Sequence, residues 1–121
     1  MKRIFLLLIF QSIIFSSCTN VSEEDLIAKE PQPTITTYND DVKTIIDNNC
    51  IVCHANPPVN GAPISLTTFN DVKNAVTNSN LINRISRQAG ESGAMPFGGP
   101  RLPQNLIDII QKWEDDGLLE E

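Results

Sequence analysis

The sequence predicts a small all-α domain of three to five helices. Apolar residues recur at a helical spacing of about 3.6 in several separate segments, of which residues 38–50 and 103–117 are the longest. Two stretches rich in proline and glycine, residues 57–63 and 90–103, interrupt these segments and exclude regular structure there. No alternation of apolar and polar residues indicates a strand. We therefore expect helices joined by long irregular connections.

The first seventeen residues have the composition of a bacterial secretory signal. Met1–Arg3 is basic and Ile4–Ile14 is largely apolar, but the run is shorter than the roughly 20 residues that span a membrane. Small residues precede Cys18, as in lipoprotein signals, although Phe15 replaces the usual aliphatic residue. We expect residues 1–17 to be removed and Cys18 to be lipidated. The alternative is a plain signal peptide that leaves Cys18 as a free thiol.

Residues 18–37 are polar and acidic, with two prolines at positions 31 and 33, and predict a flexible tether ahead of a folded domain at 38–121. The acidic residues just after Cys18 also resemble the surface-export signals of some bacterial lipoproteins. We therefore expect a protein that is lipid-anchored in the bacterial cell envelope, on the periplasmic face or the cell surface.

The mature chain is strongly acidic. Loss of Lys2 and Arg3 leaves seven basic against fifteen acidic residues, a formal charge of −8. Such a chain is unsuited to binding nucleic acid or anionic lipid by charge. We expect the acidic surface mainly to keep the protein soluble. A core this small is marginal by itself, so a bound apolar group would help to complete it.

The first helix is expected to begin near Tyr38, with Thr37 or Asn39 as its cap. Its apolar stripe leads to Cys50-Ile51-Val52-Cys53-His54, where two cysteines meet the only histidine. In an extracytoplasmic protein this spacing is typical of c-type haem attachment. On one helical turn, both thiols can add to the vinyl groups of one haem while His54 reaches its iron.

Three other readings of this motif stay open. A redox-active dithiol would need a strand leading into Cys50, whereas residues 47–49 are polar. A structural zinc site would need four ligands, and the chain has no second Cys/His pair. The third is a chance match with inert cysteines. If haem takes Cys50 and Cys53 and lipid takes Cys18, no cysteine remains for a disulfide.

The loop at 57–63 follows the motif and is expected to wrap one haem edge. A proximal histidine usually donates its second ring nitrogen to a carbonyl, and Pro63 or a near neighbour is the candidate acceptor. Residues 65–76 predict a short helix, and the segment around Leu81 another. We expect Leu66, Phe69 and Ile85 to line the haem.

Residues 90–103 contain Met95, the only methionine besides Met1. A thioether is a soft ligand suited to haem iron, and a stiff loop, fixed in part by Pro96, can hold it opposite the imidazole. The alternative is that Met95 only fills the core. Arg101 is expected to meet either a haem propionate or solvent.

The last helix is expected to run from Pro103 to a stop at Gly117. Leu106, Ile110 and Trp113 share one face in this register and should pack on the apolar stripe of the first helix. We expect Trp113 to be a packing residue.

These residues together resemble a small monohaem cytochrome c of the class I type, of the kind found on bacterial lipoproteins of Bacteroidetes and planctomycetes. The resemblance covers about Tyr38–Leu118, and its specific part is the Cys-x-x-Cys-His motif followed by the Met95-Pro96 loop. It implies a small cytochrome c fold wrapped around one covalently attached haem c, with His54 and Met95 as axial ligands.

We expect a monomeric electron carrier and not an enzyme, because the chain has no second histidine for general-base work and no Ser/His/Asp arrangement. Its redox partner proteins should bind transiently, and a basic partner would suit the acidic surface. The alternative is a haem-based sensing or binding module, in which a gas or peroxide displaces Met95. A third interpretation is an interaction module with purely structural haem.

Overall fold

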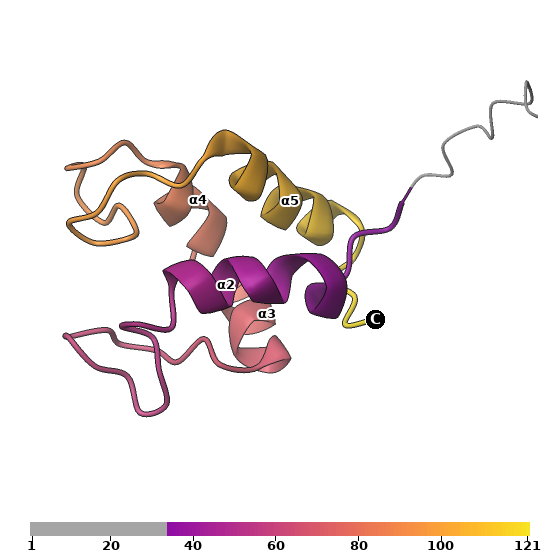
Figure 1. Cartoon of the computed structure of the whole chain (residues 1–121), viewed down its shortest axis with the longest axis horizontal. Coiled ribbons are helices and arrows are strands. Elements are labelled where there is room, and N and C mark those ends of the chain that lie inside the picture. The colour runs from indigo at the N-terminus through magenta and orange to yellow at the C-terminus, as the bar shows by residue number, and fades with distance from the viewer. Residues whose placement is uncertain (1–33) are drawn as a thin grey trace, which may run out of the picture. The chain divides into compact units, whose positions relative to one another are not determined.

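Residues 34–121, described here from a computed structural model, are mainly helical and belong to one structural unit. The elements are η2 (Tyr38–Val42), α2 (Lys43–Asn49), α3 (Phe69–Asn78), α4 (Leu81–Ser86) and α5 (Gln104–Asp115). Long irregular segments join α2 to α3 and α4 to α5, and both lie at the same end of the domain (Figure 1). The all-α class is therefore confirmed for this part of the chain. The expected signal peptide and Cys18 lie outside the described residues.

The first helix begins where the sequence predicts. The Thr37 side-chain oxygen accepts a hydrogen bond from the Asp40 backbone N–H at 3.4 Å, and the Asp41 carboxylate accepts one from the Thr37 N–H at 2.9 Å. Thr37 is thus the cap, while the first turn, η2, is a π-helix that runs directly into α2. Val42 and Ile46 are fully buried, which confirms the predicted apolar stripe.

Helix α3 begins later than residue 65, where the sequence analysis placed it. Thr68 is its cap in an extended conformation, and the Thr68 and Asp71 side chains each accept a hydrogen bond from the other's backbone N–H, at 3.2 and 3.1 Å. This capping box starts the helix at Phe69 and leaves residues 65–68 irregular.

The buried face of α5 differs by one position from the expected one. Ile107, Ile110 and Trp113 are buried, whereas Leu106 is only half-buried. Residues three apart share a helix face, so Ile107 completes this row and Leu106 lies beside it. The helix ends at Asp115, close to the predicted stop at Gly117, whose φ of 100° favours glycine.

Trp113 is fully buried at the centre of an aromatic cluster, in keeping with the packing role predicted for it. Its ring centroid lies 5.9 Å from that of Tyr38 and 6.2 Å from that of Phe69. Its indole N–H donates to the Leu119 carbonyl at 2.7 Å, which ties the C-terminal segment to the core.

The folded unit begins before residue 38, where the tether was expected to end. Thr36 and Thr37 are buried, the Thr36 N–H donates to the Asp116 carboxylate at 2.6 Å, and Thr37 pairs with Leu119 in an isolated parallel bridge. Both chain ends of the domain thus lie together, at the end opposite the two long loops (Figure 1). Each helix within residues 34–121 is too short or too polar to cross a bilayer.

Candidate functional site

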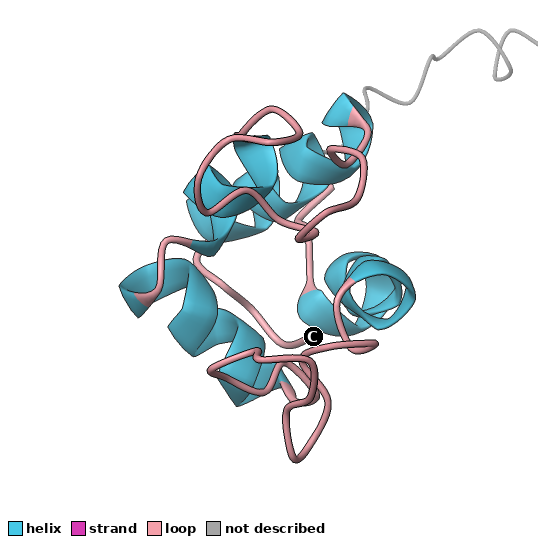
Figure 2. Ribbon diagram, turned by 90° about the vertical axis from the view of Figure 1, so that its left-hand side faces the viewer, coloured by secondary structure: helices cyan, strands magenta, loops and turns pink. Residues whose placement is uncertain are grey.

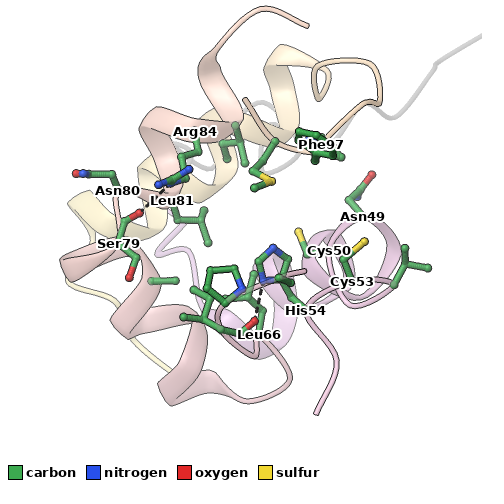
Figure 3. A pocket seen from close by; sticks show the side chains of 18 of the residues that line it. Asn49, Cys50, Cys53, His54, Leu66, Ser79, Asn80, Leu81, Arg84 and Phe97 are labelled. Atoms are coloured by element: carbon green, nitrogen blue, oxygen red, sulfur yellow. Dashed lines mark hydrogen bonds between the residues drawn. The ribbon is translucent and has the colours of Figure 1, made fainter. Parts of the chain in front are cut away.

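A cavity of about 870 Å³ opens at the loop end of the domain (Figure 3). Figure 2 views the domain from this end, with the two long loops toward the viewer. Its walls come from the end of α2, the 57–66 segment, the α3–α4 connection and the loop after α4. The apolar part of the lining includes Leu66, Ala75, Leu81, Ile85 and Leu102, all of them buried. The helices therefore carry a site whose wall is largely formed by loops.

The motif residues Cys50, Cys53 and His54 all line this cavity. Helix α2 ends at Asn49, but backbone hydrogen bonds continue its winding, because the N–H groups of Cys53 and His54 both donate to the Cys50 carbonyl, at 3.1 and 2.9 Å. Figure 3 shows both thiols and the imidazole at the same side of the cavity. The structure thus brings together the three groups that the sequence analysis grouped on one turn.

The His54 ring is fixed by a carbonyl in the following loop. Its Nδ1 lies 2.8 Å from the Ile64 carbonyl oxygen, and the Leu66 N–H donates to the His54 carbonyl at 2.8 Å. A carbonyl can only accept, so Nδ1 carries the proton and Nε2 keeps a lone pair for a metal. The acceptor is thus the neighbour of Pro63 and not Pro63 itself, which lines the cavity instead.

Of the three residues expected to line the haem, Leu66 and Ile85 line this cavity and Phe69 does not. The Phe69 ring instead lies 5.6 Å from that of Tyr38, within the aromatic cluster around Trp113. The expectation for Phe69 is therefore corrected.

Met95 and Pro96 reach the same cavity from the loop after α4. The Met95 N–H donates to the Arg84 carbonyl at 3.0 Å, which fastens the loop to α4, and the Met95 side chain is half-buried. This loop and the segment after His54 lie on different sides of the loop end in Figure 1. One cavity thus collects an imidazole, a thioether and two thiols from two distant parts of the chain.

Arg101, which was expected to meet either a haem propionate or solvent, is not among the residues that line the cavity. Its Nε donates to the Ser86 carbonyl at 2.9 Å and its Nη2 to the Gln104 side chain at 2.6 Å, so the guanidinium joins α4 to the start of α5. The arginine that does line the cavity is Arg84, which the sequence analysis missed. Its position one turn after Leu81 on a short helix was the available signal.

Burial raises the pKa of the Cys50 thiol from its usual 9.0 to about 11. A thiolate is the reactive form of cysteine, and at pH 8 about one Cys50 thiol in a thousand would be ionised. The free Cys50 thiol is therefore a poor nucleophile at neutral pH.

We expect slow alkylation of Cys50 in the cofactor-free protein. The substitutions Cys18→Ala and Cys53→Ser leave Cys50 as the one thiol that can react. Because the folded pKa is raised, its rate with iodoacetamide should climb about tenfold per pH unit up to pH 11. The same protein in denaturant serves as the control and should react much faster at pH 8. Equal rates in the folded and denatured chains would contradict the buried thiol.

Comparison of the chain with protein-family models, curated proteins and solved structures gave no match in any of the three. Within residues 34–121, no three side chains of the His, Cys, Asp and Glu types are grouped to hold a metal ion. The functional argument therefore starts from the cavity and its donor atoms.

Proposed function

We propose that this protein is a monohaem c-type cytochrome that transfers electrons. In this proposal Cys50 and Cys53 form the thioether bonds to the haem, and His54 and Met95 are the axial ligands of its iron. The observation that carries it is the single cavity that both thiols, the imidazole and the thioether line together. The small cytochrome c fold suggested by the sequence belongs to the same proposal.

The size and lining of the cavity suit such a group. A volume of about 870 Å³ lies within the range of cofactor sites, and the wall is largely apolar with a few polar groups. Nitrogen and thioether donors are the ligand types that c-type haem iron takes. The free Nε2 of His54 follows from the Nδ1 contact with Ile64, which also fixes the plane of the ring.

Haem, when bound, supplies an iron that alternates between the ferric and ferrous states. In this proposal the imidazole of His54 and the thioether of Met95 would both hold the iron, which would leave no open position for a substrate. The buried side chains of Leu66, Leu81 and Ile85 would exclude water from the bound group. Thioether ligation and a dry surrounding both favour the ferrous state and raise the potential.

An apolar rim beside the cavity offers a contact surface for a redox partner. Phe97 and Val52 both line the cavity, yet 89% and 79% of their surface is exposed. Exposed apolar patches, unlike single apolar side chains, mark interaction sites, and these two side chains line the same cavity. A small rim of this kind suits transient encounters, and the acidic chain favours a basic partner whose exchange rate falls as salt is added.

The test is an optical and redox titration of the protein produced together with a c-type haem maturation system. We expect haem that stays attached on a denaturing gel, a weak sulfur-to-iron band in the far red, and one reversible one-electron couple. Haem removed by acid and organic solvent would overturn the thioether assignment. Loss of the far-red band with rapid carbon monoxide binding would favour the sensing module, and no reversible couple a structural haem.

We also propose that Cys18, which lies outside the described residues, carries a lipid that anchors the protein in the bacterial cell envelope. Cys18→Ala should move the protein from the membrane fraction to the soluble fraction, because a diacylated N-terminus is the only anchor invoked. Its absorbance spectrum should equal that of the wild type, which serves as the control for folding. A variant that stays with the membranes would contradict lipid anchoring through Cys18.

A further inference from the structure

Arg84 is the only charged side chain among the residues that line the cavity. It extends from α4, where its Nε lies 3.4 Å from the Ser79 carbonyl and its Nη1 3.4 Å from the Gly93 carbonyl. Both contacts are long for hydrogen bonds, and Nη2 makes none within the described part of the chain. The guanidinium therefore keeps most of its capacity to bind an anion.

No carboxylate in the described part of the chain forms an ion pair with Arg84. The ion pairs found among residues 34–121 are Lys43–Asp47 and Lys112–Asp116, and neither includes Arg84. This is notable in a chain with fifteen acidic and nine basic residues. Arg84 is exposed at the edge of a largely apolar cavity and has no acidic partner within residues 34–121, so its guanidinium is available to an anionic group of a ligand.

The polar end of the cavity lies across from the cysteines. Figure 3 places Ser79, Asn80 and Arg84 on one side of the cavity and Cys50 and Cys53 on the other. The Ser79 hydroxyl and the Asn80 amide make no hydrogen bond of their own within residues 34–121. Three donors are thus free at this end.

The chemistry of haem predicts where its charge would lie. Its vinyl groups and its two propionates are on opposite halves of the ring. Thioether bonds to Cys50 and Cys53 would fix the vinyl half at their side of the cavity, so the propionates would reach the opposite side. Arg84 and Asn80 are exposed and Ser79 is half-buried, so the carboxylates would lie at a partly open edge of the cavity, where a guanidinium and hydrogen-bond donors are suited to bind them.

We infer that Arg84, with Ser79 and Asn80, binds the propionate carboxylates of the haem. The inference rests on the proposed function and names the residues that orient the ring and set its local charge. A positive charge at this end disfavours the ferric state, which carries one more charge than the ferrous state. Arg84 therefore raises the midpoint potential, and it takes the propionate contact that was considered from the sequence only for Arg101.

The experiment compares the midpoint potentials of the haem-loaded wild type and four variants at one pH and ionic strength. Arg84→Gln should lower the potential. Arg84→Lys should stay close to the wild-type potential, because it keeps the charge without the planar fork. Arg87→Gln and Arg101→Gln are matched controls. Arg87 lies on the same side of the 90–103 loop and Arg101 is bound to carbonyls, but neither lines the cavity.

Equal shifts for Arg84→Gln and the two controls would overturn the inference, since all three remove one charge from the same region. The far-red band and the haem on a denaturing gel should be retained in every variant. Their absence from the wild type would refute the proposed function itself. If Arg84→Gln fails to retain haem, retained haem with a potential near that of the wild type in Arg84→Lys supports the charge pairing, and loss of haem from Arg84→Lys or from Arg101→Gln as well refutes it.

Discussion

Met95→Ala should leave the haem attached, lower the midpoint potential and open the iron to carbon monoxide. The two thioether bonds and His54 do not depend on Met95, so attachment should survive. The iron, however, would exchange a soft sulfur ligand for water, a harder ligand that favours the ferric state. Axial ligands move haem potentials over about 0.8 V, and we expect a fall that is a sizeable part of this range.

The far-red sulfur-to-iron band reports this ligand directly, and Met95 is the only methionine left once Met1 is removed with the signal peptide. Ser92→Ala is a matched control in the same loop, since Ser92 is exposed and does not line the cavity. It should keep the band, the potential and the slow binding of carbon monoxide. An unchanged spectrum in Met95→Ala would mean that Met95 lines the cavity without binding iron.

The site could be predicted from the sequence where local geometry decides it. Cys50, Cys53 and His54 lie within one turn, so their spacing alone places them on one face. Met95 could be chosen because the stiff loop around it leaves few other reasons for a methionine there. Local sequence patterns do not describe how long loops fold. Only the structure shows that the motif residues and Met95 line the same cavity.

The contacts of long side chains could not be predicted in this way. Arg84 and Arg101 are both near the Met95 loop in sequence, and only the packing of α4 against α5 shows which one lines the cavity. The acceptor for His54 was predicted within one residue, because the loop is short enough to leave few carbonyls in reach. The start of α3 was missed because the spacing of apolar residues does not fix where a helix begins, and here Thr68 caps the helix together with Asp71.

The predicted stripe on α2 and the buried Trp113 rest on a stronger signal, namely apolar residues at helical spacing. On α5 the buried position is Ile107 and not the predicted Leu106, which corresponds to a rotation of the buried face by one residue about the helix axis. Both residues are large and aliphatic, so hydropathy alone does not distinguish them. Helix existence and helix faces thus followed from the pattern, whereas their rotation was decided by packing.

Trp113→Ala should be the most destabilising single change in the described part of the core. Trp113 is fully buried, contacts the rings of Tyr38 and Phe69, and binds the Leu119 carbonyl. Truncating a buried aromatic to alanine costs about 3–5 kcal/mol, because the apolar contacts are lost and a cavity remains. For a domain of this size that corresponds to a fall in Tm of roughly 15–30 °C.

Trp113→Phe separates the packing of this side chain from its hydrogen bond. Phenylalanine keeps much of the apolar contact but removes the indole donor and leaves the Leu119 carbonyl with only the Tyr38 N–H, so we expect a smaller loss of about 1–2 kcal/mol. Asn105→Ala, an exposed position on the same helix, should stay within about 0.5 kcal/mol of the wild type. Thermal unfolding of the haem-loaded proteins followed by circular dichroism measures all three. A Tm near that of the wild type in Trp113→Ala would contradict a core built around this ring, because no neighbouring side chain could fill the space that it leaves.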